Sequence, residues 1–149
     1  MDVLQLSVAP TEEAGPPERT IDLEVNGRDL RDIVGEIESP FAEVEGHPQL
    51  AGQYTGLPAS HLVPPSRHLF GQPTGAYGYT DKVTLLQCSC GEPGCWPLLA
   101  RVTTTAETVV WSDFEQPHRR GRWSYEMLGP FVFDRRHYER AIETGRQVI

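Results

Sequence analysis

The chain has 149 residues, and its 13 lysine and arginine residues face 21 aspartate and glutamate residues, which gives a formal net charge of −8. Hydrophobic residues make up 38% and charged residues 23%, a balance typical of a folded globular domain. No apolar run approaches the roughly 20 residues that span a bilayer, so the sequence excludes a membrane protein, and its composition excludes a secreted disulfide scaffold and a general nucleic-acid coat.

Two short runs near the N-terminus, residues 4–8 and 21–25, alternate apolar residues with polar or small ones. A period of two predicts half-buried β-strands. Residues 10–19 between them are rich in proline and glutamate, and we predict a mobile loop there. The first residues lack the basic leader and the apolar core of a signal peptide.

Helical spacing of apolar residues begins at Leu30 and predicts a helix with Asp29 as its N-cap. We expect this helix to end before Pro40, because a residue that precedes proline avoids the helical conformation. The segment 46–80 contains many glycines and prolines and has no sustained period. It carries too many aromatic and aliphatic groups for a free linker, so we predict an ordered loop with Tyr54, Leu62, Leu69, Phe70 and Tyr79 buried.

The second half of the chain reads as four strands followed by a helix. We predict the strands at residues 82–88, 98–104, 108–114 and 131–133, and a final helix at 135–147 with Asp134 as its N-cap. This order of elements predicts an α+β fold, a mostly antiparallel sheet with two packed helices and a long irregular loop. We expect residues 1–149 to form a single domain.

All three cysteines lie within eight residues, in the run Cys88-Ser-Cys90-Gly-Glu-Pro-Gly-Cys95. Residues two apart on a strand point to the same side, so Cys88 and Cys90 share a face. The segment 92–95 favours a type II turn, because Gly94 supplies the positive φ that this turn requires. The turn can return Cys95 toward Cys90, and the three thiolates then converge on one point.

Three soft thiolate ligands suit zinc, which takes four ligands in a closed tetrahedral site. We predict a structural zinc held by Cys88, Cys90, Cys95 and His118, because His118 follows the strand at 108–114. The other histidines considered as the fourth ligand are His61, His68 and His137. A catalytic zinc would also need a water-activating carboxylate, and none lies at a recognisable spacing.

Two other interpretations of the cysteines stay open. In the first, Cys88 is an ordinary core residue, since free cysteines are among the most buried residues. In the second, Cys90 and Cys95 form a disulfide, although an odd cysteine count without an export signal argues against a disulfide framework.

Several polar and aromatic residues are candidates for ligand or partner binding. Asp113, His118, Arg119 and Arg120 lie within eight residues, and Trp96 follows the cysteine turn. Arginine and tryptophan are enriched in the energetic centres of protein interfaces, although tryptophan on a strand is more often core and a charged loop is more often just solvated. The long loop adds a second group of candidates, His61, Arg67 and His68.

The run from Cys88 to Leu98, then Trp111-Ser-Asp113-Phe and Pro117-His118-Arg119, resembles a group of small uncharacterised bacterial proteins. The resemblance covers roughly the C-terminal half of the chain. It implies a bacterial, cytoplasmic protein with one compact domain, and it carries over no catalytic residue, cofactor or partner.

Two functions are compatible with these patterns. The first is a small acidic protein-interaction module like an immunity protein or an antitoxin, since an acidic inhibitor associates quickly with a basic partner. The alternative is a small enzyme or ligand-binding domain with His61, Arg67, His68, Asp113 and His118 around a pocket. The sequence contains no Walker loop, dinucleotide fingerprint or nucleophile elbow. We expect a protein partner, no nucleic acid and no membrane, and the enzyme question stays open.

Overall fold

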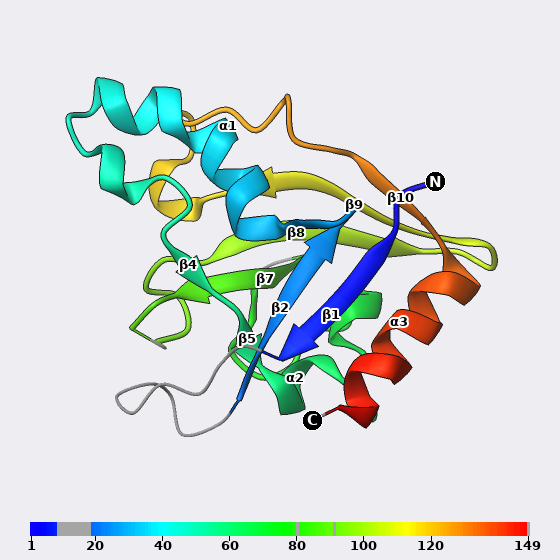
Figure 1. Cartoon of the computed structure of the whole chain (residues 1–149). Helices are drawn as coiled ribbons and strands as arrows, with labels where there is room; N and C mark the ends of the chain where they lie inside the picture. Colours follow the sequence, from blue (N-terminus) through cyan, green and yellow to red (C-terminus); the bar gives the residue numbers. More distant parts are fainter. Residues whose placement is uncertain (9–18, 80, 91, 149) are drawn as a thin grey trace.

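A computed structural model describes residues 1–8, 19–79, 81–90 and 92–148 and confirms the predicted α+β class. Most of the loop predicted at 10–19 lies outside the described residues. The strands form two antiparallel sheets that curl around one apolar core, and two long helices flank them (Figure 1).

The first sheet is built on β2 (Thr20–Val25), which pairs with β1 (Leu4–Val8) along its whole length. Two shorter strands, β3 (Arg28–Asp29) and β5 (Leu57–Pro58), pair with the two ends of β2. Asn26 and Gly27 join β2 to β3 with φ of 54° and 81°, the left-handed conformation of a two-residue hairpin turn. The two strands predicted from alternation are therefore confirmed.

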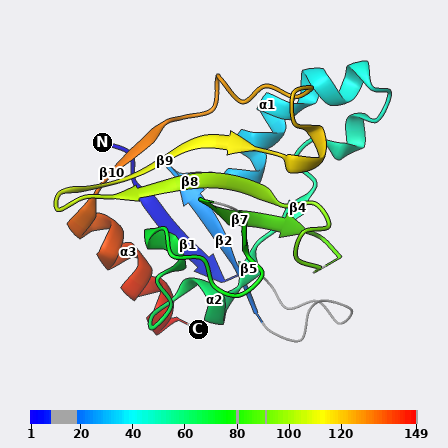
Figure 2. The ribbon, with the colours of Figure 1, turned by 180° about the vertical axis from the view of Figure 1, so that it is seen from behind.

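The second sheet has the order β10-β9-β8-β7-β4, with β6 also paired to β7 (Figure 2). Its strands are β4 (Tyr54–Thr55), β6 (Gly78–Tyr79), β7 (Lys82–Cys88), β8 (Leu98–Thr104), β9 (Thr108–Glu115) and β10 (Phe131–Asp134). The four longer strands lie where the sequence predicts them. A register shift between β8 and β9 leaves one extra residue on β9, where Asp113 has a φ of 51°.

Within the described residues, the two sheets are connected at Asp2 and at Gly56. At one, the N-terminal residue Asp2 bridges to Phe133 of β10, and its backbone N–H donates to the carbonyl of Val132 over 2.9 Å. At the other, the chain passes from β4 on β7 to β5 on β2 through Gly56. A Cβ at Gly56 would lie 2.0 Å from the carbonyl oxygen of Ile21, so only glycine allows this approach.

The first long helix, α1 (Leu30–Val44), begins at the predicted cap, since the Asp29 side chain accepts from the N–H of Arg31 over 2.8 Å. The predicted end before Pro40 is wrong, because the helix continues four residues beyond it. Pro40 is exposed, whereas Ala42 is fully buried. Burial of the last turn therefore outweighs the backbone hydrogen bond that proline removes.

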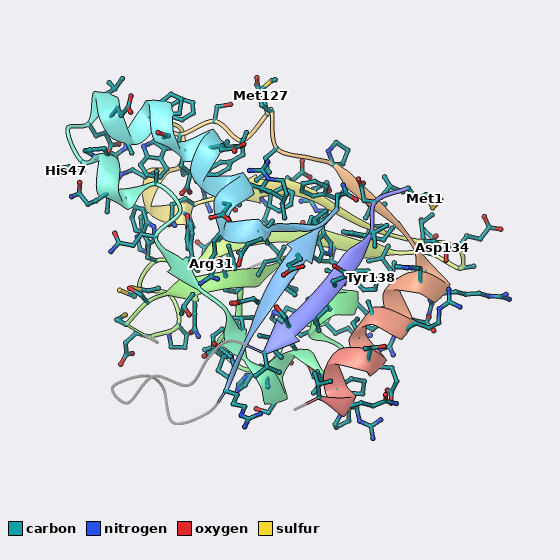
Figure 3. All side chains as sticks on the ribbon, viewed as in Figure 1. Met1, Arg31, His47, Met127, Asp134 and Tyr138 are labelled. Atoms are coloured by element: carbon teal, nitrogen blue, oxygen red, sulfur yellow. The ribbon has the colours of Figure 1, made fainter. Side chains whose placement is uncertain are left out.

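The last helix, α3 (Arg135–Gln147), has the predicted bounds and follows Asp134, which is labelled in Figure 3. The Asp134 carboxylate accepts from the N–H of His137 over 3.0 Å. The inward residue of this helix, Tyr138, is fully buried. The Tyr138 hydroxyl accepts from the indole of Trp111 over 3.0 Å and donates to the carbonyl of Leu69 over 2.5 Å. This side chain joins α3, the second sheet and the long segment 46–80.

The segment 46–80 consists of short elements. Besides β4, β5 and β6 these are η1 (Pro48–Leu50), the four-residue helix α2 (Ala59–Leu62) and η2 (His68–Phe70). Tyr54, Leu62 and Leu69 are buried as predicted, and Phe70 is half-buried. The expected burial of Tyr79 is wrong, since 50% of it is exposed. Its ring lies beneath the guanidinium of Arg120, with 5.6 Å between the ring centroid and Cζ.

A buried carboxylate, that of Glu38, lies between α1 and the second sheet. It is fully buried, and it accepts from the hydroxyl of Tyr54 over 2.5 Å, from the hydroxyl of Tyr125 and from the N–H of Gly52 over 2.8 Å. The side-chain amide of Gln116 also donates to Tyr54 over 3.2 Å. Burial raises the pKa of Glu38, and the three donors act in the opposite direction.

We predict that Glu38→Ala lowers the free energy of unfolding by about 3 kcal/mol, because two hydroxyls and one N–H lose their acceptor in the interior. Glu38→Gln keeps an acceptor and loses about 1 kcal/mol. Chemical denaturation at pH 7 measures both values. An Ala variant within about 0.5 kcal/mol of the parent contradicts this role.

The raised pKa of Glu38 also predicts the sign of a pH effect. The folded chain holds this proton more tightly than the unfolded chain, so the contribution to stability is complete below the ordinary value of 4.5 and is lost as pH rises through the raised pKa. As pH rises over this range, the free energy of unfolding of the parent should therefore fall relative to that of Glu38→Gln. A difference between the two proteins that does not change with pH contradicts the account.

Candidate metal centre

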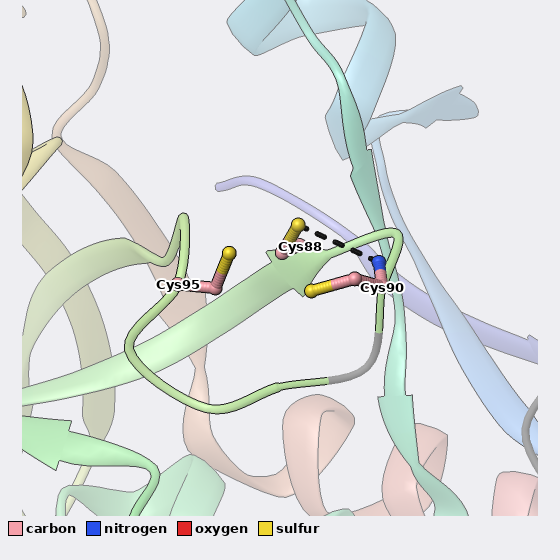
Figure 4. A group of neighbouring side chains, drawn as sticks. All are labelled: Cys88, Cys90 and Cys95. Atoms are coloured by element: carbon pink, nitrogen blue, oxygen red, sulfur yellow. Dashed lines mark hydrogen bonds between the residues drawn. The ribbon is translucent and has the colours of Figure 1, made fainter.

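The three cysteines occupy the end of β7 and the turn that leads to β8 (Figure 4). Cys88 is the last residue of β7, where it is half-buried opposite Tyr54 of β4, and Cys90 and Cys95 are exposed. The N–H of Cys95 donates to the carbonyl of Glu92 over 3.3 Å, and Gly94 has a φ of 81°. The predicted turn, which returns the chain to the cysteines, is confirmed.

The three sulfur atoms all lie within 4.8 Å of one another. The backbone N–H of Cys90 donates to the sulfur of Cys88 over 3.4 Å, which holds the start of the turn against the strand end (Figure 4). All three side chains are free thiols, so the Cys90–Cys95 disulfide is not formed in the structure. Cys88 is also less buried than a core cysteine.

This donor set is suited to a metal ion. With zinc–sulfur bonds of about 2.3 Å, two thiolates of a tetrahedral site lie about 3.8 Å apart. The three sulfur atoms lie within 4.8 Å of one another, and this upper limit is about 1 Å longer than the sulfur–sulfur distance of a zinc-bound site. Thiolates favour zinc and other soft ions over calcium or magnesium. The three cysteines are therefore close enough to hold a metal ion.

The three thiols also influence one another's protonation. Hydrogen bonding from Cys88 lowers the pKa of Cys90, and a backbone hydrogen bond from Glu92 adds to this effect. Hydrogen bonds to Cys90 and Cys88 raise the pKa of Cys95 to about 11. Of these two thiols, Cys90 therefore forms its thiolate at the lower pH.

His118, the predicted fourth ligand, lies beside the cysteine turn in η3 (Pro117–Arg119). Its Nε2 is 2.9 Å from the carbonyl oxygen of Gly94, and its ring stacks on Trp96 with 5.9 Å between centroids. Within the described part of the chain, the group of converging metal ligands contains the three cysteines alone. The structure thus places His118 in contact with Gly94, the residue before Cys95. Its role as the fourth ligand stays a prediction.

An aromatic and charged cluster adjoins the turn. The guanidinium of Arg119 lies between Trp96 and Trp123, with Cζ 5.0 Å and 5.6 Å from the ring centroids. Its Nε donates to Glu45 over 3.0 Å, and the indole of Trp123 donates to the same carboxylate over 2.9 Å. Although desolvation acts in the opposite direction, these donors lower the pKa of Glu45. Glu45, the C-cap of α1, has no local sequence signal linking it to Arg119.

Asp113 and Arg120 lie outside this cluster. Asp113 forms an ion pair with Arg101, which also pairs with Asp81 over 2.6 Å, and Arg120 pairs with Glu115 over 3.0 Å. A groove of about 580 Å³ is lined by Asp113 and by Lys82, Arg101, Ser112, Phe114, Tyr125, Glu126, Leu128, Gly129 and Pro130. No histidine lines it, so the structure does not place the predicted histidines around this groove.

The other predicted binding residues have local partners. His68 is fully buried; its Nε2 is 2.7 Å from the carbonyl oxygen of Thr84, and its Nδ1 accepts from the N–H of Thr74 over 3.1 Å. Both ring nitrogens are thereby used, and burial lowers the pKa of the ring. The ring of His61 meets Tyr77 edge-on at 4.8 Å, and the guanidinium of Arg67 lies over Phe70 at 4.8 Å.

No family model matches the chain, and neither a curated protein nor a solved structure matches it. Among the helices of the described residues, none has the length and apolar character needed to cross a membrane.

Arg119→Ala should lower the melting temperature by about 3 °C, because Trp96, Trp123 and Glu45 all lose a partner. Arg120→Ala is the matched control, since Arg120 is exposed and its ion pair is worth little. Thermal denaturation followed by tryptophan fluorescence measures both variants. Equal shifts for the two would show that the cluster does not stabilise the fold.

Proposed function

We propose that this chain is a small acidic protein-interaction module whose cysteine turn is stabilised by a structural zinc ion. The observation that carries the proposal is the convergence of Cys88, Cys90 and Cys95, whose sulfur atoms lie within 4.8 Å of one another on a surface turn. A short turn that brings three free thiols together can bind a metal ion, and the bound ion would stabilise the turn.

Cys88, Cys90, Cys95 and His118 would hold the ion in this proposal. His118 is favoured as the fourth ligand because its imidazole already contacts Gly94 of the same turn. The ion would supply a cross-link between the end of β7, the turn and η3. Because the ligand set includes no carboxylate to activate water, we assign the zinc a structural role rather than a catalytic one.

The choice of a protein as partner rests on charge and composition. A net charge of −8 opposes the phosphate backbone of nucleic acids and attracts a basic protein. The proposed partner surface is the face around the metal turn, where Trp96 is half-buried and His118 is exposed. An acidic inhibitor of a basic protein, as immunity proteins and antitoxins are, fits this description. We place it in the bacterial cytoplasm, as the resemblance implies.

A second candidate is a small enzyme or ligand-binding domain. The observation that favours it is the groove of about 580 Å³ beside Asp113, which combines Phe114 and Leu128 with Arg101 and Ser112. Apolar surface with a few polar groups is typical of ligand sites. Arg101 is already paired with Asp81 and Asp113, so its charge is not available to a ligand. The interaction module is therefore the better supported proposal.

For the metal, we expect about one zinc per chain after purification without added metal, measured by elemental analysis. Cys90→Ser and Cys95→Ser should each lose most of it, whereas Ser89→Ala, a change in the same turn without a thiol, should keep it. His118→Ala should lower occupancy under a competing chelator. Metal-free, folded parent protein whose melting temperature does not respond to chelators would overturn the zinc proposal.

For the partner, we expect the chain to capture a basic protein from its native lysate and to ignore duplex DNA and single-stranded RNA near physiological salt. Pull-down and fluorescence titration measure the two interactions. Nucleic-acid binding that Arg119→Ala and Arg120→Ala together abolish would contradict the partner assignment. Recovery of no protein partner would favour the ligand-binding candidate.

A further inference from the structure

A second groove, of about 380 Å³, lies between β1 and α3, on the side of the first sheet away from β3. The helix runs alongside the strand (Figure 1), and it comes so close at one end that a Cβ on Gly145 would lie 2.9 Å from the Cβ of Leu6. The groove has an apolar part formed by the half-buried Leu6 and Ala141, next to the fully buried Leu4. It is thus closed at one end and partly apolar, as ligand sites are.

The helix side of the groove carries positive charge that the protein does not neutralise. Along α3, Arg135 pairs with Glu139 over 2.8 Å and Arg146 with Glu143 over 3.0 Å. Arg140, which lines the groove together with His137 and Thr144, forms no ion pair or hydrogen bond with any described residue. Arg136, one turn earlier on the same helix, likewise forms no ion pair or hydrogen bond with a described residue, but it does not line the groove.

The strand side of the groove carries the opposite charge. Glu24 of β2 lies directly opposite Gln5 of β1 in the ladder and lines the same groove. Neither a salt bridge nor a hydrogen bond joins the Glu24 side chain to another described residue, Arg140 included. The groove therefore presents an unpaired carboxylate and an unpaired guanidinium on its two sides.

We propose that this groove binds a free α-amino acid with an apolar side chain. Its carboxylate would face Arg140, whose guanidinium fork suits a bidentate carboxylate contact. Its ammonium would face Glu24, and its side chain would cover Leu6 and Ala141. Gln5, Ser7, His137 and Thr144 supply the remaining polar contacts. This site is independent of the metal centre and goes beyond the interaction proposed above.

The two charges select this class of ligand over simpler ones. A fatty acid would pair with Arg140, but its carboxylate would lie near that of Glu24, which it cannot neutralise. An alkylamine would pair with Glu24, but its ammonium would lie near the guanidinium of Arg140. A zwitterion satisfies both sides at once, and its charges are separated by a single carbon. The volume of about 380 Å³ lies at the low end for ligand pockets and is large enough for one amino acid.

Titration of ¹⁵N-labelled protein, followed by amide chemical shifts, tests the proposal with three probes. L-leucine should shift the amides of residues 5–7 and 137–144. N-acetyl-L-leucine lacks the ammonium and L-leucinamide lacks the carboxylate, so each should bind at least about tenfold more weakly. Absence of localised shifts with about 10 mM leucine, or equal affinity for the three probes, overturns the proposal.

Variants test the two charged contacts separately. Arg140→Gln and Glu24→Gln should each weaken leucine binding about tenfold, because each removes one charge-assisted contact. Arg136→Gln is the matched control, since Arg136 precedes Arg140 by one helical turn and does not line the groove. Unchanged affinity in either test variant, or an equal loss in the control, contradicts the assignment. The spectra themselves show that each variant is folded.

Discussion

The buried carboxylate of Glu38 is the interaction on which the rest of the candidate metal centre depends. It holds the hydroxyl of Tyr54, and Tyr54 lies opposite Cys88 in the ladder between β4 and β7. Gln116 donates to the same hydroxyl, and its side-chain oxygen accepts from the N–H of His118 over 3.2 Å. One carboxylate thus positions both the strand that ends in Cys88 and the turn that carries His118. Burying an acidic side chain in the middle of a helix costs free energy. The hydrogen bonds that the Glu38 carboxylate accepts offset this cost, so the fold tolerates the buried acid.

The cysteine turn and the end of α1 form one connected unit. Trp96 follows Cys95 directly and stacks on Arg119, which in turn pairs with Glu45 at the end of α1. A metal ion that fixes the turn would therefore also fix the position of the helix end. This connection gives a physical reason for a structural ion in a domain that already has an extensive apolar core.

Much of the fold could be predicted from the sequence because the signals are local. The cap at Asp134, the strands of the second half and the turn at Gly94 each depend on residues within a few positions of one another. The predicted end of α1 is wrong, because the burial of Ala42 is a tertiary effect that outweighs the local effect of Pro40. The roles of Glu38 and Glu45 could not be predicted, since their partners lie up to 87 and 78 residues away in the chain.

The cysteine turn is proposed to hold a zinc ion with a defined set of ligands, Cys88, Cys90, Cys95 and His118. X-ray absorption at the zinc edge, on protein purified without added metal, measures that set directly. The account predicts three sulfur scatterers at about 2.3 Å and one nitrogen at about 2.0 Å. A spectrum described by oxygen and nitrogen scatterers alone would contradict it, because the ion would then lie away from Cys88, Cys90 and Cys95.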